Sequence, residues 1–484
     1  MSTVQFSEAL IDSINALDGN KKKLFEKQLK QWLEKKYQFN KVDQAVKLEG
    51  VLLTSAQQRL YAMCDTEQGY KANLVCQKIT LTGKLDTEKL VKGLLLVTER
   101  HPAFKTLFKQ GPDGDVLQWI DNRITHEVEQ FDFSGAADAN KQLAALELSH
   151  SGQKFDLENG PIFRFSLVSM SDESHILFFT SHNLVFDAWS YDIFIRELKH
   201  FYNTSVSGKK SSLQRNRNDF LDYVCWGEVW ASGKRYKKQM DYWQHTIDFA
   251  HSDDLTLDFP RGEQARGYSG KRIEFTLPSE LKNRLNDISK ANSATFFMTS
   301  LAAITAFFSR TMSMKNISIG TISANRPRPE VENIIGYFLN LTPINTTVDT
   351  SSDSLLDILS QVKEQSLNAI ENIDVYRESL VKSKNLSFDP LRNPFFDILF
   401  SFETIQGSES GFSGIKESYQ DLDKGTARYD LTLSLYDDDD RFYGWIEYNT
   451  DLFKDETAQA LTEKFTAWLE QITKQPEQAL NKIG

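Results

Sequence analysis

Residues 176–203 constrain the fold more than any other stretch, because they predict a buried strand, a loop and a helix in direct succession. Residues 176–180, Ile-Leu-Phe-Phe-Thr, form a continuous apolar run, which is typical of a central strand. Ser190 is a good helix N-cap, and Asp192 in the first turn favours the helix dipole. The apolar spacing of residues 193–203 then predicts the body of a helix.

The rest of the chain continues this alternation and predicts an α/β fold. Residues 161–168 alternate like a half-buried strand, and strands and helices follow one another from residue 47 without an internal repeat. A chain of 484 residues fits two domains of roughly 200 residues each. Residues 205–212 are the most linker-like segment, being rich in Ser, Gly and Lys. We therefore expect N-terminal helices at 1–46, an N-terminal lobe at 47–215 and a C-terminal lobe at 216–484.

Two helices are predicted at the amino terminus, one over residues 6–17 and one over residues 21–36. Phe25, Leu29, Trp32 and Leu33 form an apolar stripe on the second helix, and seven lysines against two glutamates surround that stripe. Such a basic face is either a solvated helix surface or a docking surface for an acidic partner such as a carrier protein.

Composition excludes several classes of protein. A net charge of −11 argues against general nucleic-acid binding. No apolar run approaches the roughly 18 residues of a membrane span, and the amino terminus lacks the pattern of a signal peptide. The three cysteines, Cys64, Cys76 and Cys225, suit a reducing cytoplasm, where they serve as small buried side chains.

Metal-binding spacings are also missing from the sequence. The eight histidines show no His-x-x-x-His pattern, and the cysteines show no Cys-x-x-Cys pattern. The acidic run at residues 437–440 lies between two strand-like segments and predicts an exposed hairpin turn rather than a metal site.

Seven sequence blocks occur in order between residues 53 and 432. They are Leu53 to Tyr61, Glu99 to Phe108, Ser181 to Ala188, Leu221 to Trp226, Ile319 to Asn340, Asp389 to Phe396 and Tyr429 to Thr432. Together they resemble the motifs of condensation domains of nonribosomal peptide synthetases. One departure is Lys105, which stands where the second block usually has Arg.

The resemblance implies a fold and a reaction. It implies two chloramphenicol-acetyltransferase-like α/β lobes arranged as a V, with a tunnel between them and the loop of residues 181–188 at its midpoint. A donor carrier protein would present an acyl or peptidyl thioester on phosphopantetheine, and an amine on a second carrier or free in solution would attack it. No metal or bound cofactor of the domain's own is expected, and secondary-metabolite biosynthesis in the cytoplasm is the implied setting. The chain would be a stand-alone protein or the first domain of a synthetase.

The third block departs from the family pattern His-His-x-x-x-Asp-Gly at two positions. His182 lies five residues before Asp187, as the first His of the pattern does. Asn183 therefore stands where the family carries its catalytic second His, and Ala188 replaces Gly. A carboxamide is no general base near neutral pH, although it can still form hydrogen bonds. Asn183, His182 and Asp187 are the candidate catalytic residues. His182 is expected to be structural, with a recruited catalytic role as the alternative.

Four further residues are expected to support this site: Arg164, Ala188, Trp189 and Asn340. By the resemblance, Arg164 would form a salt bridge with Asp187 and so hold the loop. A Gly at position 188 would supply a positive φ or a close approach to a ligand, so the methyl group of Ala188 would narrow the tunnel. Trp189 is expected to pack in the core, and Asn340 to form structural hydrogen bonds.

Three functions stay open at this point. The first is an amide-forming enzyme in which Asn183 is tolerated or specialised, or is an engineered change in an active domain. The second is a catalytically impaired module of the same fold that recruits other enzymes to carrier-bound peptides. The third is an acyltransferase that takes acyl-coenzyme A or another non-carrier donor.

Overall fold

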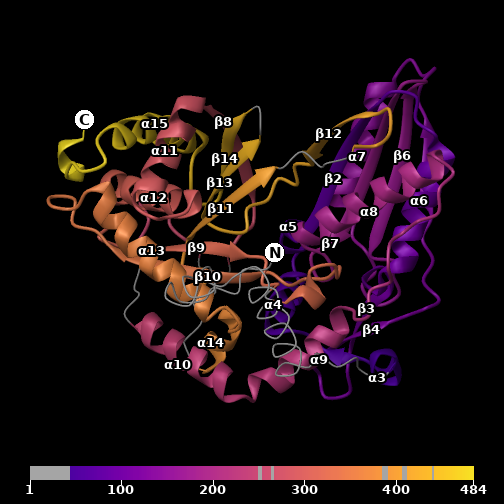
Figure 1. The fold of residues 1–484 in the computed structure, drawn as a ribbon, viewed down its shortest axis with the longest axis horizontal. Helices are drawn as coiled ribbons and strands as arrows, with labels where there is room; N and C mark the ends of the chain where they lie inside the picture. The colour runs from indigo at the N-terminus through magenta and orange to yellow at the C-terminus, as the bar shows by residue number, and fades with distance from the viewer. Residues whose placement is uncertain are drawn as a thin grey trace, which may run out of the picture.

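The structure is a computed structural model that describes residues 44–248, 253–262, 266–326, 328–383, 391–405, 411–438 and 441–483. The helices predicted over residues 6–36, with the lysine-rich face, lie outside the described residues. The predicted α/β class is confirmed, because helices and strands alternate through two sheet-based halves that lie side by side in Figure 1.

The first half contains two sheets and the helices that cover them. Its elements are α3 (Gln44–Glu49), β1 (Val51–Leu52), α4 (Ser55–Met63), α5 (Glu67–Ala72), β2 (Leu74–Thr82), α6 (Thr87–Arg100), η1 (Pro102–Lys105), β3 (Thr106–Gln110), β4 (Val116–Ile120), β5 (Val128–Asp132), α7 (Ala139–Gly152), β6 (Phe163–Ser171), β7 (Ser174–His182) and α8 (Ala188–Val206). A small sheet has the order β1-β4-β3. The main sheet has the order β12-β2-β7-β6-β5, in which β12 (Lys416–Asp421) comes from much later in the chain.

The second half is built on one six-stranded sheet with the order β10-β9-β11-β13-β14-β8. Its elements are α9 (Phe220–Ala231), α10 (Lys234–Asp248), β8 (Gly270–Leu277), α11 (Ser279–Ala291), α12 (Phe296–Met312), β9 (Asn316–Ser323), η2 (Pro329–Val331), β10 (Asn340–Thr347), α13 (Leu355–Glu371), α14 (Arg377–Ser383), β11 (Ile398–Ile405), β12 (Lys416–Asp421), β13 (Leu431–Asp438), β14 (Phe442–Asn449), α15 (Asp455–Lys474) and η3 (Leu480–Lys482). β13 and β14 pair antiparallel, as the predicted hairpin requires, from Leu431 opposite Tyr448 to Asp437 opposite Phe442. The acidic run begins within β13, and the turn predicted to be exposed at residues 439–440 lies outside the described residues.

Strand β12 joins the two halves. It lies between β11 and β13 in sequence, yet it leaves their sheet and pairs antiparallel with β2 at the edge of the first half's sheet, as Figure 1 shows. The pairing runs from Lys416 opposite Thr82 to Asp421 opposite Gln77. The chain then returns through residues 422–430 to β13, so this returning segment passes directly from one half to the other.

The strand, loop and helix predicted over residues 176–203 are confirmed with adjusted ends. Strand β7 is central, with β2 on one side and β6 on the other, as a fully apolar strand requires. Helix α8 begins at Ala188, and its N-cap is Asp187 rather than Ser190, because the Asp187 side chain accepts a hydrogen bond from the Ser190 N–H. The helix also continues to Val206, past the predicted end.

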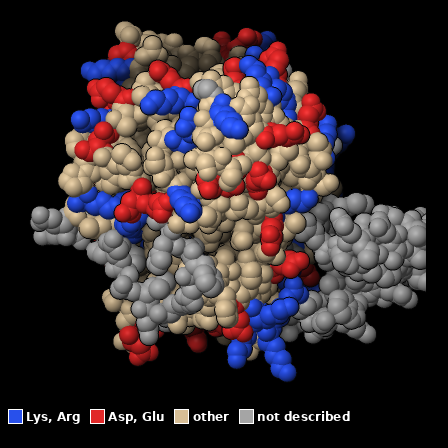
Figure 2. Space-filling model, turned by 90° about the vertical axis from the view of Figure 1, so that its left-hand side faces the viewer, with Lys and Arg blue, Asp and Glu red and all other residues tan. Residues whose placement is uncertain are grey.

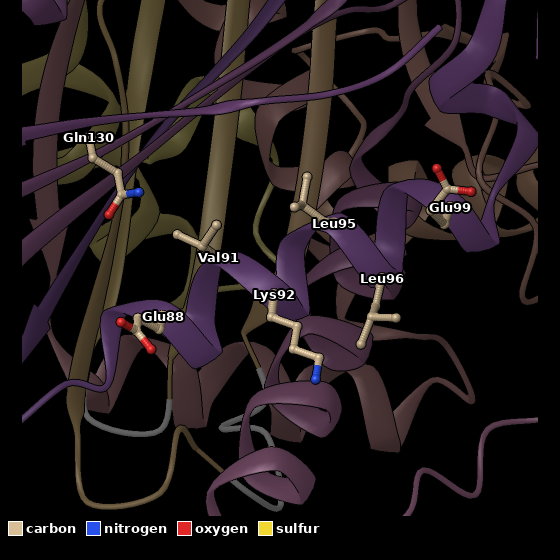
Figure 3. Close-up of a pocket in the computed structure, with 7 residues that line it drawn as sticks. All are labelled: Glu88, Val91, Lys92, Leu95, Leu96, Glu99 and Gln130. Carbon is tan, nitrogen blue, oxygen red and sulfur yellow. The ribbon is translucent and has the colours of Figure 1, made fainter. Parts of the chain in front are cut away.

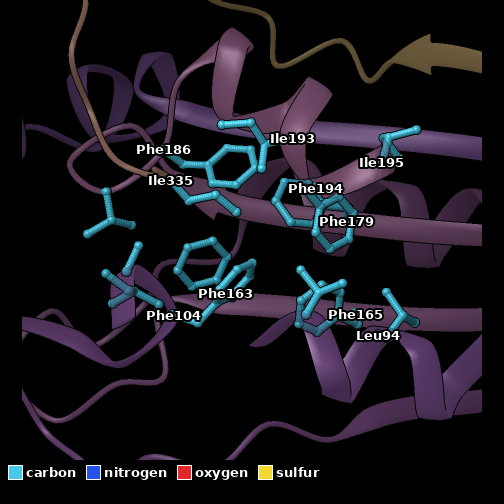
Figure 4. Close-up of a cluster of buried hydrophobic side chains, with 14 of the residues drawn as sticks. Leu94, Phe104, Phe163, Phe165, Phe179, Phe186, Ile193, Phe194, Ile195 and Ile335 are labelled. Atoms are coloured by element: carbon cyan, nitrogen blue, oxygen red, sulfur yellow. The ribbon is translucent and has the colours of Figure 1, made fainter. Parts of the chain in front are cut away.

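Two large apolar cores stabilise the halves. In the first, Phe186 of the loop packs among phenylalanines of β6, β7 and α8, with ring centroids 4.9 Å from Phe179 and 5.8 Å from Phe163 (Figure 4). This core also takes in side chains from residues 220–224, 331–338 and 412–422. The lobe boundary at residue 215 stays a prediction, because those later residues pack with the first half.

The second core lies under the six-stranded sheet, and α12 is its most buried helix. Acidic and basic side chains are interspersed over the outer face of this half in Figure 2, without a large patch of one sign. In the described part of the chain, no single helix is both long and apolar enough to cross a membrane. The pair α11–α12, bent by 107°, meets that test only by its combined length and composition.

Candidate active site at the loop after strand β7

Asp187 anchors the C-terminal end of the loop through a fully buried network. Its carboxylate accepts hydrogen bonds from the backbone N–H of Ser190 (2.7 Å) and of Phe338 (3.0 Å). Arg326 Nη2 lies 3.0 and 3.2 Å from the two carboxylate oxygens. Both partners of this ion pair are buried, so it acts as one unit that ties the loop to the segment before β10.

The segment at residues 335–338 completes this anchor. The Ser190 hydroxyl accepts from the Gly336 N–H (3.0 Å) and donates to the Gly336 carbonyl (2.9 Å). Gly336 has to be glycine, because a Cβ there would lie 2.4 Å from the Phe220 ring. The first turn of α8 is therefore fixed by backbone from the second part of the chain.

The predicted salt bridge between Arg164 and Asp187 is wrong. Arg164 lies within β6 opposite Thr180, and its guanidinium packs over the Phe155 ring at 4.9 Å. Burial lowers the pKa of Arg164, and the charge of Glu129 opposes that shift. The residue that holds Asp187 is Arg326, and sequence reasoning assigned it no role.

His182 is buried and turned toward the interior of the first half. Its Nδ1 accepts the Leu184 N–H at 3.1 Å, so Nε2 carries the ring proton and faces Cys64 Sγ at 3.5 Å. The Tyr70 ring centroid lies 4.9 Å away. Burial, aided by the charge of Lys424, lowers the pKa of His182 to about 3. Neither ring nitrogen has a lone pair free for a substrate proton, which is the arrangement of a structural histidine.

Asn183 occupies the N-terminal end of the loop and contacts a second arginine. Its backbone N–H donates to the Asn73 carbonyl at 2.8 Å. Its side-chain amide, in the orientation that satisfies both polar atoms, donates to the Phe186 carbonyl (3.2 Å) and accepts from Arg428 Nη1 (3.0 Å). The residue is 6% exposed. A carboxamide thus holds a guanidinium group at the position where the sequence pattern places an imidazole.

Arg428 and Lys424 come from the returning segment, residues 422–430. Lys424 Nζ donates to the Leu74 carbonyl at 2.7 Å, next to the pairing of Leu74 with His182. Burial, together with the neighbouring charge of Arg428, lowers the pKa of Lys424 to about 8. The returning segment therefore places two cationic side chains beside the loop.

The other predicted support residues lie as follows. Ala188 is the first residue of α8, is exposed, and is not among the described non-glycine residues with positive φ, so it needs no glycine-like backbone. Trp189 does not pack in the core. It is 41% exposed, and its indole N–H donates to the Glu332 carbonyl at 2.9 Å. Asn340 uses its amide fully, donating to the carbonyls of Ile373 and Val375 at 2.9 Å each and accepting from the Leu341 N–H.

The residues that sequence reasoning missed are Arg326, Arg428 and Lys424. The first two lie inside or directly before two of the seven sequence blocks, namely the block that contains the Asn325-Arg326 pair and the block that begins at Tyr429. That proximity is the only signal the sequence offered, because each contact spans more than 100 residues.

A separate hollow of about 390 Å³ lies against α6 and is shown in Figure 3. It is lined by Glu88, Val91, Lys92, Leu95, Leu96, Glu99 and Gln130, none of which belongs to the loop after β7. Among the residues that the structure describes, no three His, Cys, Asp or Glu side chains gather as metal ligands would.

The structure is thus an α/β protein whose two sheet-based halves are joined by β12 and meet at a loop anchored by a buried Asp–Arg pair. The model of the condensation domain family matches residues 47–484, and the chain belongs to that family. It is 30% identical to bacitracin synthase 1 of Bacillus licheniformis over 89% of this chain and 8% of that protein. It is 29% identical to malpinin synthetase of Mortierella alpina over 83% of this chain and 5% of that protein. The chain thus spans less than a tenth of the length of either relative.

Solved structures share the fold. The X-domain from teicoplanin biosynthesis superimposes with a TM-score of 0.79 at 22% identity, covering 92% of this chain and 99% of that one. The first condensation domain of the calcium-dependent antibiotic synthetase superimposes with a TM-score of 0.76 at 16% identity, covering 91% and 99%.

Proposed function

We propose that this protein forms an amide bond between an acyl or peptidyl thioester, presented by a carrier protein, and an amine acceptor in nonribosomal peptide biosynthesis. The observation that carries the proposal is the intact anchoring of the active-site loop. Asp187, Arg326, Ser190 and Gly336 hold it by buried bonds, although the second histidine is replaced. Membership of the condensation domain family and the likeness to regions of two large synthetases support the same class of reaction.

The reaction needs little from the protein beyond placement. The amine nitrogen forms a bond to the thioester carbonyl carbon, the carbon–sulfur bond breaks, and the thiol leaves on the carrier's phosphopantetheine arm. The nitrogen sheds one proton, and the departing sulfur gains one. Because the phosphopantetheine arm belongs to the carriers, the domain contributes binding, orientation and electrostatics.

The roles follow from what each side chain can do. Asn183 holds Arg428 and cannot remove the amine proton, and His182 is spent on Leu184 and Cys64. General-base help is typically worth about 10²- to 10⁴-fold, or roughly 3–5 kcal/mol of barrier. Holding two reactants in place can contribute about 7–11 kcal/mol. Turnover without a base at position 183 is therefore expected for an amine that arrives unprotonated.

A second candidate function is recruitment without catalysis. It is favoured by the replaced histidine and by the fold shared with the X-domain from teicoplanin biosynthesis, which has also been solved in complex with OxyB. In this alternative the domain binds carrier-bound peptides and a second enzyme through its surface, and the loop after β7 serves only stability.

One assay separates the two candidates. Acyl-loaded carrier protein and an amine are supplied, and the amide product is followed by mass spectrometry for the native chain and for Asn183→His. Carrier binding is measured in parallel, and His182→Phe serves as the control, because that ring is buried away from the reaction in this proposal.

We expect product from the native chain and a rate gain with Asn183→His of up to about 10²- to 10⁴-fold, largest near neutral pH where the amine is protonated. Equal, substantial rates would mean that catalysis makes no use of position 183. No product from either chain, with carrier binding retained, would overturn the proposal in favour of recruitment.

A further inference from the structure

Arg428 is a cation beside the loop, and its side chain donates one hydrogen bond among the described residues. Its Nη1 donates to the Asn183 side chain at 3.0 Å, and it is half-buried. Arg326, which contacts the other end of the loop, is neutralised by Asp187. No carboxylate among the described residues forms an ion pair with Arg428, although a guanidinium group offers five N–H donors.

The surroundings of Arg428 add positive charge. Lys424 lies close enough for the charge of Arg428 to contribute to lowering the Lys424 pKa. The nearest carboxylate in sequence, Asp430, is already held by Arg261 at 2.6 Å and by Arg266 at 3.2 Å. The buried ring of Tyr337 also lies near Arg428, whose positive charge opposes the burial that raises the pKa of Tyr337. A partly exposed guanidinium group in such a setting is suited to an external anion.

From this geometry we infer that Arg428, oriented by Asn183, is a carboxylate-binding site, and that the substrate of this domain carries a carboxylate near the bond that forms. The statement about the substrate rests on the proposed function, whereas the binding site itself does not depend on turnover. A planar guanidinium group with two adjacent N–H groups free matches the two oxygens of a carboxylate. Asn183 serves here as a positioning residue, because it fixes one edge of the guanidinium group and leaves the others for the ligand.

The replacement of histidine by asparagine gains a physical reason from this inference. An imidazole next to a guanidinium group would lose its proton readily and would repel Arg428 whenever it was protonated. A neutral carboxamide accepts the Arg428 N–H at any pH. The loop thereby exchanges a proton acceptor for a fixed anchor of a cation.

Matched probes test the site by direct binding. The first pair is the succinyl and the succinamoyl thioester of N-acetylcysteamine, which differ only in a carboxylate against a carboxamide and place it on the donor side. The second pair is free alanine and alaninamide, which place the same difference on the acceptor side. Affinities are measured by isothermal titration calorimetry for the native chain, Arg428→Gln, Arg428→Lys and Asn183→Asp.

In one of the two pairs, we expect the native chain to bind the carboxylate probe about 10- to 100-fold more tightly than its amide partner. The pair that shows the preference identifies the side of the reaction that carries the carboxylate. Arg428→Gln should abolish the preference for the carboxylate probe. Arg428→Lys should retain part of it, because Lys keeps the positive charge but lacks the paired N–H donors of the guanidinium group. Asn183→Asp should also abolish it, since a built-in carboxylate beside Arg428 competes with the ligand.

A matched control is Arg196→Gln on α8, because Arg196 Nη2 likewise donates to an asparagine, Asn333, at 2.8 Å, but on the exposed surface. It should keep the native preference. Equal native affinity for both members of each pair would overturn the inference, and so would an equal loss with Arg196→Gln. An unchanged KM with an equal fall of kcat for both members of a pair in Arg428→Gln would also overturn it, since that pattern belongs to transition-state stabilisation. If Arg428→Gln does not fold, the native preference and Asn183→Asp decide.

The outcome is separable from that of the proposed function. A carboxylate preference that requires Arg428, found without amide product from any probe, would keep the binding site and remove the condensation activity. Amide product without any carboxylate preference would keep the condensation activity and remove the binding site.

Discussion

Each end of the loop between β7 and α8 contacts one arginine, and the two arginines are held in opposite ways. At Asp187, Arg326 is buried, donates to a carboxylate and two backbone carbonyls, and packs over the Phe338 ring at 4.0 Å. At Asn183, Arg428 is half-buried and donates only one side-chain hydrogen bond among the described residues. A neutralised, fully buried cation stabilises the fold, whereas a cation held by a neutral amide remains available to a ligand. The two ends of one loop thus divide anchoring from recognition.

The largest effect is expected at the anchored end. Arg326→Met leaves the buried Asp187 carboxylate without its cation, so the free energy of unfolding should fall by about 3–5 kcal/mol. Urea denaturation followed by circular dichroism measures it. The exposed pair Lys271–Asp455 provides the control, because Lys271→Met should cost less than about 1 kcal/mol. Similar losses of unfolding free energy for Arg326→Met and Lys271→Met would contradict the distinction between a buried and an exposed ion pair.

The next effect concerns pH and the buried His182. Its pKa in the folded protein is about 3, below the ordinary 6.5, so below pH 6.5 the unfolded chain takes up a proton that the folded protein does not. Stability is therefore lost as the pH falls from 6.5 toward 3. Between pH 7.5 and 4.5 the native chain should lose about 2–3 kcal/mol more than His182→Phe, in denaturant titrations at both pH values. His245→Gln, an exposed histidine of α10, should behave as the native chain. Parallel losses for native and His182→Phe would place the ring in contact with water.

A smaller effect is expected at the recognition end. Arg428→Met removes one hydrogen bond of a half-buried side chain, so the free energy of unfolding should change by about 1 kcal/mol or less. The same variant should lose the carboxylate preference described above. A destabilisation as large as that of Arg326→Met would show that Arg428 is also an anchor, and the comparison between the two ends would fail.

The smallest effect is expected at Ala188. This residue begins α8 without a positive φ, so Ala188→Gly should destabilise the protein by only about 0.5 kcal/mol, through added freedom of the unfolded chain. Thermal unfolding at a fixed pH measures the difference. A gain in stability would show that the alanine methyl group is strained in the loop, as the family's glycine suggested.

Local patterns were enough to predict the fold class, because the burial pattern of a strand or helix is set by residues that are close in sequence. The apolar run of β7 and the spacing of α8 depend on side chains a few positions apart, so both elements were predictable. The exact ends of these two elements were less predictable. Asp187 rather than Ser190 became the N-cap because its carboxylate is positioned by Arg326 and the Phe338 N–H, far along the chain.

The sequence by itself determined the α/β class and the family, and it predicted that a carboxamide stands at position 183, where the family pattern has a histidine. Only the tertiary structure decided which arginine meets which end of the loop. Arg164 lies near Asp187 in sequence but packs over the Phe155 ring, whereas Arg326 and Arg428 come from 139 and 245 residues away. Sequence spacing constrains partners on one helix or strand, but contacts between lobes depend on how β12 and the returning segment cross from one sheet to the other.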